Sequence, residues 1–345
     1  MTSKRTFKFF VACCVVVLGL FPMASQAAKP LVWKAASIYA TPVNEVTNSK
    51  GLALKKFAQM VEERSQGRMK IEIYWNAVLG GSMEIFDLMR MGELELFFGQ
   101  PMATSDKRFG VWSVPYLFTT EEEVIRIACD PNGKMFKLAD KWIGENDGKL
   151  LAIGLAGLRG FVNSQKVIKR PEDLKGLKCR VYQDPVVNLF WEGLCNASPL
   201  PLSELYTSMQ TRTVDGSEFQ ATGVLTYKLY EVGKYFSDID WQWVSNANMI
   251  ASKQHWEALP DDLKVIVSGA AIEAMQFQSE LEPKFVTASY KDLQDKGVSV
   301  YRLSPEDREV WEKYARSLDN KMRAVIGPEA YDEVLNIIKE AKAAK

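Results

Sequence analysis

The chain has 345 residues, of which 47% are hydrophobic and 25% charged, and its 43 basic and 43 acidic residues give a formal net charge of zero. These fractions are typical of a globular protein, and the length predicts about two domains. A neutral chain lacks the basic surface that nucleic acid requires, and the single histidine, His255, argues against zinc sites and histidine-dependent nucleophiles. Composition therefore favours a binding protein over an enzyme.

The N-terminus has the three regions of a secretory signal. Lys4, Arg5 and Lys8 precede an apolar run over residues 9–21, and small residues follow up to Ala27. A membrane anchor or a buried N-terminal helix is the alternative, but thirteen apolar residues are too few for a comfortable span, which needs about 20. We expect residues 1–27 to be a cleaved signal peptide and the mature chain to be periplasmic.

Hydrophobic patterns along the chain alternate between strands and helices. In the first part, a helix that ends at Gly67 precedes a strand over 69–74, a helix from 82 to about 91 and a buried strand over 94–98. Further along the chain, the patterns predict strands at 149–155, 160–164, 178–182 and 214–219. They also predict a helical turn at 171–174 and helices that begin at 185 and 203. A long helix is expected after residue 262, and two amphipathic helices are expected in the last forty residues. This order predicts an α/β fold, and Pro283 is expected to kink or divide the long helix.

Three cysteines remain after the predicted signal: Cys129, Cys179 and Cys195. Cys179 and Cys195 can pair if they lie close together, but the interpretation that we favour is that all three are buried apolar residues. Asp238 and Asp240 could hold a cation, although a solvated surface pair fits the sequence better, because the glycine and terminal glutamate of a calcium loop are missing. Phosphate-binding and nucleophile motifs are also absent from the sequence, so no cofactor, metal or catalytic residue is expected.

Ordered motifs give the chain a specific resemblance. They are Gly157-Leu158-Arg159-Gly160, the run Pro171 to Val181 that contains L-K-x-R-V, Ser203-Glu204-Leu205-Tyr206, and Val214-Asp215-Gly216-Ser217-Glu218. Together with Leu79-Gly80-Gly81 and Pro115-Tyr116-Leu117-Phe118, they resemble the DctP-type solute-binding proteins of tripartite ATP-independent periplasmic (TRAP) transporters. The resemblance extends over about residues 31–319.

The resemblance implies a two-lobed periplasmic-binding-protein-like α/β fold, with several interlobe crossovers and a long connecting helix. Lobe I is expected at 28–156 plus 246–285, and lobe II at 157–245 plus 286–345. The protein would bind a small organic acid between the lobes and deliver it to TRAP membrane permease subunits, which import it with sodium.

In the family, the arginine of L-K-x-R-V holds the ligand carboxylate through two parallel hydrogen bonds, and that position is Arg180. A planar guanidinium matches a carboxylate, and charge-assisted hydrogen bonds are about twice as strong as neutral ones. The arginine of G-x-R, here Arg159, often assists. Salt bridges on the surface or between the lobes are the alternative role for both arginines.

Further candidate ligand-binding residues are Glu218 of the D-G-x-E motif, Phe219, Gln100, Trp75 and Trp241. Phe219 stands where sialic-acid-type members carry asparagine, Gln100 where they carry glutamate, and Trp75 where proline is common. These aromatic residues lead to the hypothesis that the acid is sparsely hydroxylated, although aromatic residues also dominate cores.

Two other functions stay open on the sequence alone. The protein could serve a membrane sensor instead of a transporter, or it could be a secreted enzyme that acts on organic acids. The scarcity of histidine and the missing nucleophile motifs count against the enzyme.

Overall fold

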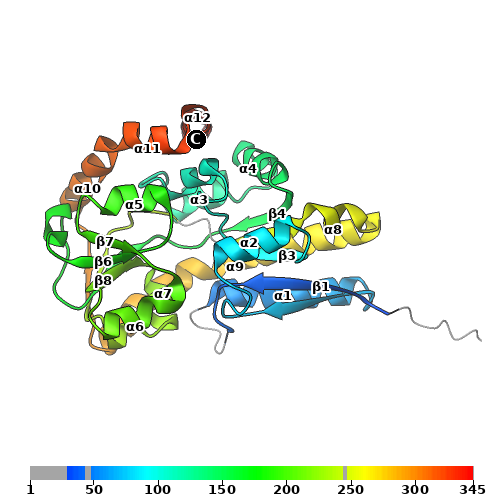
Figure 1. The fold of residues 1–345 in the computed structure, drawn as a ribbon, viewed down its shortest axis with the longest axis horizontal. Coiled ribbons are helices and arrows are strands. Elements are labelled where there is room, and N and C mark those ends of the chain that lie inside the picture. The colour runs from blue at the N-terminus through cyan, green and yellow to red at the C-terminus, as the bar shows by residue number, and fades with distance from the viewer. Residues whose placement is uncertain (1–28, 43–47, 244–246, 345) are drawn as a thin grey trace, which may run out of the picture.

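The structure is a computed structural model, and it describes residues 29–42, 48–243 and 247–344. The expected signal peptide therefore lies outside the described residues. Two mixed β-sheets with helices packed on them form the two lobes of an α/β fold (Figure 1). Within the described part of the chain, no helix combines the length and hydropathy that a membrane crossing requires.

The sheet of the first lobe has the strand order β2-β1-β3-β10-β4. Its strands are β1 (Leu31–Ser37), β2 (Met69–Tyr74), β3 (Leu96–Gly99), β4 (Gly148–Gly154) and β10 (Ala247–Ser252). Strands β2 and β3 pair in parallel with β1, whereas β10 runs antiparallel between β3 and β4. This lobe also contains α1 (Ser49–Arg64), α2 (Ser82–Arg90), the 3-10 helix η1 (Lys107–Ser113), α3 (Glu121–Ile127), α4 (Lys134–Gly144) and α8 (Lys253–Ala258).

The sheet of the second lobe has the order β11-β9-β5-β8-β6-β7. Its strands are β5 (Gly160–Asn163), β6 (Lys178–Val181), β7 (Asn196–Pro199), β8 (Gly216–Phe219), β9 (Tyr235–Asp238) and β11 (Ser299–Arg302). Strand β6 is parallel to both β7 and β8, while β5 is antiparallel to β8 and β9. The helices here are η2 (Pro171–Leu174), α5 (Pro185–Trp191), η3 (Leu202–Glu204), α6 (Leu205–Gln210), α7 (Ala221–Thr226) and η4 (Leu229–Glu231).

The chain passes between the sheets three times, from β4 to β5, from β9 to β10 and through α9 (Asp261–Asp295) to β11. Helix α9 has 35 residues and packs on α1 and β4 in the first lobe and on α7 and β11 in the second. Of the two outcomes predicted for Pro283, division of the helix is wrong, because α9 continues through this residue, and a kink stays a prediction. Proline removes one backbone hydrogen bond, but buried residues on both sides, such as Ser279 and Leu293, keep the flanking turns packed.

Three C-terminal helices lie across both lobes (Figure 1): α10 (Pro305–Ser317), α11 (Asp319–Ile326) and α12 (Pro328–Ala343). The sequence predicted only two of them. Helix α11 packs on α5 and η1, which belong to different lobes. At the far end of α12, Arg126 of α3 donates a 2.8 Å hydrogen bond to the carbonyl oxygen of Ala341, and Lys342 lies 3.0 Å from Glu123. The C-terminus is thereby fixed to the first lobe.

Candidate functional site

Two arginines of the second lobe meet beside the crossover segments. Arg180 lies in β6, in register with Ser198 of β7 and Ser217 of β8. Arg159 precedes β5, where its N–H donates to the carbonyl oxygen of Gln242 at 2.9 Å and its own carbonyl oxygen accepts from the N–H of Trp241 at 3.1 Å. These two backbone bonds join neighbouring crossover segments and fix the base of the Arg159 side chain.

Glycine is required on both sides of Arg159. Gly157 has a φ of +80°, a left-handed conformation that favours glycine. At Gly160, an added Cβ would lie 2.5 Å from the carbonyl oxygen of Ser237. The glycines of the G-L-R-G motif therefore allow the backbone conformation in which the Arg159 side chain reaches Glu218.

One carboxylate lies between the two guanidinium groups. Glu218 of β8 is fully buried, and its Oε2 forms an ion pair with Nη1 of Arg159. Its Oε1 lies 3.4 Å from Nη1 of Arg180 and accepts a 3.2 Å hydrogen bond from the N–H of Tyr182. Arg159 and Arg180 are only 7% and 2% exposed, so this is a buried cluster with two cations and one anion.

Donors on both arginines remain unused. Nε of Arg180 donates to the carbonyl oxygen of Leu200 at 2.9 Å, but Nη2 has no hydrogen-bond partner among the described residues. Nε of Arg159 is buried and also lacks a partner in this part of the chain. Burial lowers the pKa of Arg180 to about 10; the Arg159 charge acts in the same direction, whereas Glu218 opposes it. The cluster is suited to accept an anion.

Aromatic rings border this cluster. The guanidinium of Arg159 lies 4.8 Å from the ring centroid of Tyr182 and 5.8 Å from that of Phe219. Phe219 in turn meets Tyr227 edge-on at 5.7 Å. These rings restrain the guanidinium and add favourable cation–π contacts.

A series of side-chain hydrogen bonds through the Tyr182 hydroxyl joins the two lobes. Nε2 of Gln242 donates to the Tyr182 hydroxyl at 2.7 Å, that hydroxyl and Ser113 Oγ share a 2.9 Å bond, and Ser113 donates to Asp184 Oδ2 at 3.1 Å. Ser113 belongs to η1 of the first lobe, whereas Tyr182 and Asp184 belong to the second. Asp184 also caps α5 by accepting from the N–H of Val186 at 2.8 Å.

Burial raises the pKa of Asp184 from 3.8 to about 6, although its hydrogen bonds act to lower it. The ionised carboxylate is therefore unfavourable in the folded state, and this destabilisation develops as pH rises from about 4 to 6. Asparagine caps helices equally well and carries no charge. We expect Asp184→Asn to be more stable than wild type at pH 7 and to lose that advantage, up to about 3 kcal/mol, by pH 4.

Urea titrations at pH 4, 5, 6 and 7 measure this difference. Asp106, which caps η1, is the matched control, because hydrogen bonds from Arg108 lower its pKa despite the opposing effect of burial. Asp106→Asn should therefore lose stability relative to wild type as pH rises. A pH-independent difference for Asp184→Asn would contradict the assignment.

The structure brings Arg159, Arg180, Glu218 and Phe219 into contact, whereas the side chains of the other three candidates make no such contact with this group among the described residues. Gln100 follows β3, is 4% exposed, and its Nε2 has no partner among the described residues. Trp75 is half-buried and packs on the core of the first lobe. The Trp241 ring stacks on Phe190 with centroids 4.9 Å apart, so it lies in the aromatic core of the second lobe. No hydrogen bond, ion pair or ring contact between described residues links these three side chains to the arginines.

Sequence reasoning missed Tyr182 and Glu282. Tyr182 follows L-K-x-R-V directly, so its place beside the arginine strand was a usable signal. Glu282 lies in the middle of α9 and is fully buried, with Ser49 as a hydrogen-bond donor, Lys50 Nζ at 3.4 Å and Thr222 Oγ1 at 3.3 Å. Only the folded chain brings these residues of α1, α7 and α9 together.

The expectation of a solvated Asp238–Asp240 pair is wrong for Asp238. It is 4% exposed and accepts a 2.6 Å hydrogen bond from Tyr290, and burial raises its pKa to about 7. Asp240 forms an ion pair of 2.7 Å with Arg308. The described residues contain no group of three or more potential metal ligands.

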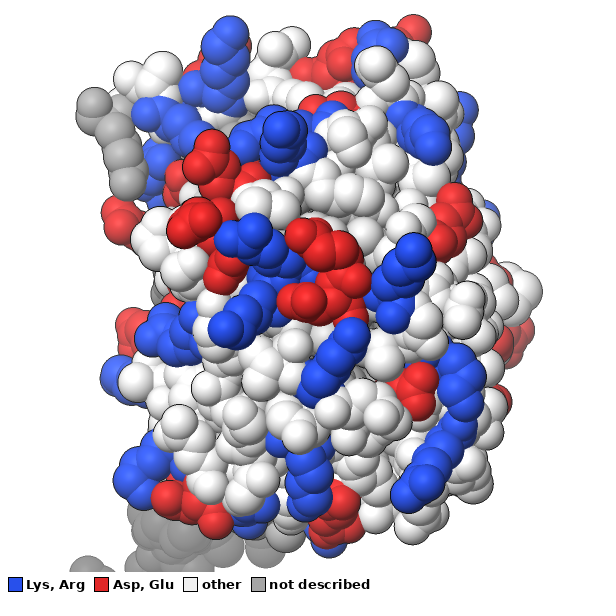
Figure 2. All heavy atoms as spheres, turned by 90° about the vertical axis from the view of Figure 1, so that its left-hand side faces the viewer, with Lys and Arg blue, Asp and Glu red and all other residues white. Residues whose placement is uncertain are grey.

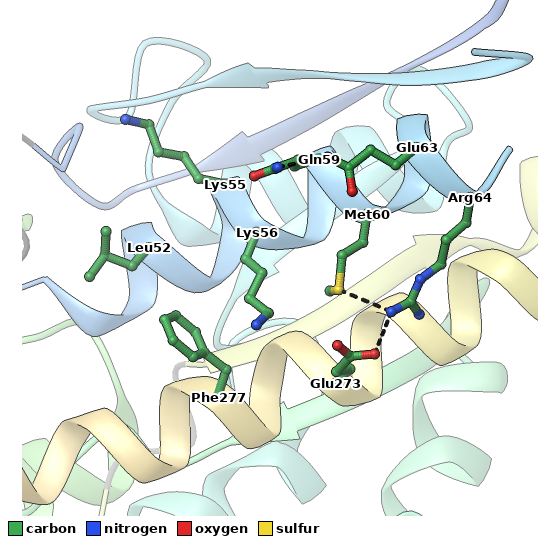
Figure 3. A pocket seen from close by; sticks show the side chains of 9 residues that line it. All are labelled: Leu52, Lys55, Lys56, Gln59, Met60, Glu63, Arg64, Glu273 and Phe277. Atoms are coloured by element: carbon green, nitrogen blue, oxygen red, sulfur yellow. Dashed lines mark hydrogen bonds and ion pairs between the residues drawn. The ribbon is translucent and has the colours of Figure 1, made fainter. Parts of the chain in front are cut away.

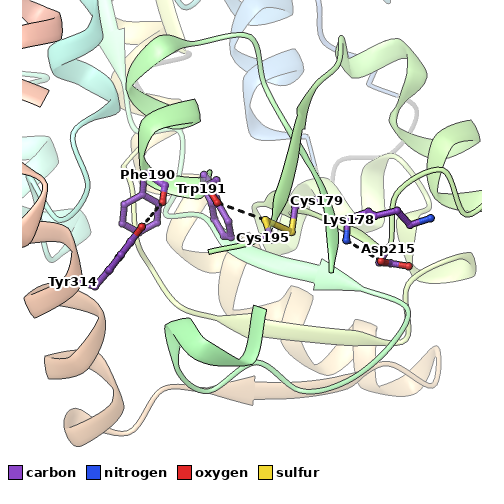
Figure 4. Close-up of a disulfide and its surroundings, with 7 residues drawn as sticks. All are labelled: Lys178, Cys179, Phe190, Trp191, Cys195, Asp215 and Tyr314. Atoms are coloured by element: carbon purple, nitrogen blue, oxygen red, sulfur yellow. Dashed lines mark hydrogen bonds between the residues drawn. A yellow bond between two sulfur atoms is a disulfide. The ribbon is translucent and has the colours of Figure 1, made fainter. Parts of the chain in front are cut away.

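A disulfide joins Cys179 to Cys195 across a Cα–Cα distance of 6.2 Å (Figure 4). The interpretation of both residues as buried free cysteines is therefore wrong. The disulfide connects β6, which carries Arg180, to the segment between α5 and β7. Cys129 is free, and burial raises its pKa to about 12, so its thiol is protonated.

Two surface pockets lie away from the arginines. A groove of about 520 Å³ runs between α1 and α9, where Arg64 pairs with Glu273 at 2.5 Å and Lys56 lies over the ring of Phe277 (Figure 3). A second pocket, of about 350 Å³, lies beside Cys129 and Met275. On the outer face of the second lobe, basic and acidic side chains are interspersed (Figure 2). This face therefore mixes charges of both signs, whereas the buried cluster holds two cations with one anion.

The chain is similar to known proteins over most of its length. The family model "DctP: Bacterial extracellular solute-binding protein, family 7" matches residues 41–324. The C4-dicarboxylate-binding periplasmic protein DctP of Rhodobacter capsulatus is 26% identical over 95% of this chain and 97% of its own length.

Two crystal structures are also similar. The sugar acid binding protein DctPAm of Advenella mimigardefordensis, in complex with galactonate, is 28% identical with a TM-score of 0.81, and the match covers 91% of this chain and 99% of that one. A TRAP periplasmic solute-binding protein of Chromohalobacter salexigens with bound D-glucuronate is 25% identical with a TM-score of 0.82, over 90% and 99% of the two chains.

Proposed function

The chain belongs to the DctP family of TRAP periplasmic solute-binding proteins, and we propose that it is a receptor that holds one small organic acid against Arg180. The observation that carries the proposal is the buried cluster, in which two guanidinium groups share a single carboxylate and keep unused donors. A ligand carboxylate would satisfy these donors with charge-assisted hydrogen bonds.

Lobe closure is the second part of the proposal. Residues 28–156 plus 246–285 would move as one lobe, and residues 157–245 plus 286–345 as the other, except that the end of α12 would stay with the first lobe, to which Ala341 and Lys342 bond. The ligand would favour the closed state by contacting both lobes at once. The Ser113–Tyr182 hydrogen bond supports this idea, because it joins the lobes and Tyr182 also contacts the guanidinium of Arg159.

We also propose a location and membrane partners for the receptor. After removal of residues 1–27, the receptor would work in the periplasm and deliver its acid to TRAP membrane permease subunits for sodium-coupled import. Family membership supports this role. The rings of Tyr182 and Phe219 beside Arg159 also support an acid that has a sparsely hydroxylated body.

Thermal unfolding of residues 28–345 tests carboxylate binding. The protein is first unfolded and refolded to remove any acid retained from the host. It is then heated with small acids, and with their amides and alcohols as controls. A ligand at 100 times its dissociation constant adds about 2.7 kcal/mol of stability, so we expect the midpoint to rise by a few degrees for one class of acid and not for its amide. An equal rise with acid and amide would contradict the proposal, as would no rise with any acid.

A further inference from the structure

The charges around Arg180 bear on how many carboxylates the ligand carries. We propose that the receptor selects monocarboxylates and rejects acids that carry a second carboxylate on the same skeleton. This inference rests on the proposed function, because it assumes that an acid binds at Arg180.

The charge of Arg159 is already compensated. Its Nη1 forms an ion pair with Glu218 Oε2 and donates to the carbonyl oxygen of the same residue at 3.3 Å. Both side chains are buried, and breaking such a pair would leave an uncompensated charge in a low-dielectric environment. Arg159 can therefore donate hydrogen bonds to a ligand, but it supplies no free positive charge.

Arg180 is the cation that remains. Its only carboxylate partner among the described residues is Glu218, at the longer distance of 3.4 Å. Because Glu218 already compensates Arg159, the cluster as a whole carries one excess positive charge. One ligand carboxylate brings this cluster to neutrality, and a second would make it negative.

In the part of the chain that the structure describes, no second uncompensated cation contacts the cluster. No other lysine or arginine forms a hydrogen bond, ion pair or ring contact with Arg159, Arg180, Glu218, Tyr182 or Phe219 in the described residues. Lys50, which is buried, pairs with Glu282 at 3.4 Å. The sequences of the undescribed segments 43–47 and 244–246 contain no lysine or arginine.

One acidic group beside the cluster acts against a second negative charge. Asp184 is buried two residues after Tyr182, and Ser113 links the two side chains. A dianionic ligand would be repelled by the Asp184 carboxylate when it is ionised.

The family comparisons contain both kinds of ligand. The Rhodobacter capsulatus relative is a C4-dicarboxylate-binding protein, whereas the Advenella mimigardefordensis structure holds galactonate, which has one carboxylate. The charge balance of this chain agrees with the second kind.

Isothermal titration calorimetry with matched acids tests the inference. Each pair shares a carbon skeleton and differs by one carboxylate: galactonate with galactarate, butanoate with succinate, and 4-methylbenzoate with terephthalate. We expect at least one monocarboxylate to bind and its dicarboxylate counterpart to bind at least about 100-fold more weakly. A dicarboxylate that binds as tightly as its counterpart, or more tightly, would overturn the inference but leave carboxylate binding intact. If no acid bound the refolded protein, the proposed function would fail and the inference with it.

A variant at Glu218 raises the net positive charge of the cluster. Glu218→Gln adds one positive charge to the cluster, so it should shift the ratio of dicarboxylate to monocarboxylate affinity by at least about tenfold toward the dicarboxylate. The control is Glu204→Gln, which removes an exposed acidic group from η3 in the same lobe and should leave the ratio unchanged. Thermal unfolding confirms that each variant is folded. An unchanged ratio in folded Glu218→Gln would count against the inference, and the titrations on wild type decide it if this variant does not fold.

Discussion

Arg180→Ala is expected to weaken binding of the acid by about 100-fold or more, because truncating one partner of a buried charge pair costs about 2–5 kcal/mol. The change removes the only uncompensated cation of the cluster and leaves Glu218 paired with Arg159 alone. Arg180→Lys should also lose at least about tenfold, since an ammonium is a point charge without the two-pronged geometry of a guanidinium. Isothermal titration calorimetry with the acid that gives the largest thermal shift measures both losses.

Lys178→Ala is the matched control for Arg180. Lys178 begins the same strand but is exposed, and among the described residues its ammonium donates only to the carbonyl oxygen of Arg212. Binding should stay within about twofold of wild type, because exposed charges contribute little. Wild-type affinity in both Arg180 variants would refute the assignment of Arg180 as the carboxylate partner.

Removing the disulfide should produce the second large effect. Cys179 and Cys195 are separated by 16 positions, and closing a loop of that size stabilises a protein by about 3 kcal/mol. We expect the double variant Cys179→Ala and Cys195→Ala to lose about that free energy of unfolding in urea titrations. Affinity should fall as well, because Cys179 immediately precedes Arg180 on β6.

Reduction of the wild-type protein provides an independent measurement of the same bond. Dithiothreitol should reproduce the loss of stability in wild type and have no effect on the double variant. Cys129→Ala tests the free thiol instead, and its stability should depend on dithiothreitol in the same way as that of wild type. Equal stability of oxidised and reduced wild type would contradict a structural role for the disulfide.

Periodicity and apolar runs predicted many of the elements. Strand β2 alternates along residues 69–74 and was predicted with its observed bounds, and the buried strand β3 was predicted from its apolar run. Strand β10 was not predicted, because its sequence shows neither alternation nor a continuous apolar run of large residues, and only its pairing with β3 and β4 identifies it as a strand. Strand β1 was expected only as a first strand before the helix that ends at Gly67, without bounds, because it also lacks regular alternation.

The site was predictable where a motif carried it. Arg159, Arg180 and Glu218 lie in motifs of the second lobe, and the pairing of β5, β6 and β8 brings them together. The hydrogen bond between Ser113 and Tyr182 joins residues 69 positions apart, and no local pattern encodes it. Phe219 and Trp241 looked alike as aromatic candidates, but only Phe219 contacts a guanidinium, because the Trp241 ring packs against Phe190.

The most direct test of the account is a crystal structure of the refolded protein with the acid that gives the largest thermal shift. We predict that the ligand carboxylate accepts two hydrogen bonds from the guanidinium of Arg180, with Glu218 still paired to Arg159. A carboxylate bound elsewhere, such as in the groove between α1 and α9, would contradict the central claim that the buried arginine cluster is the binding site.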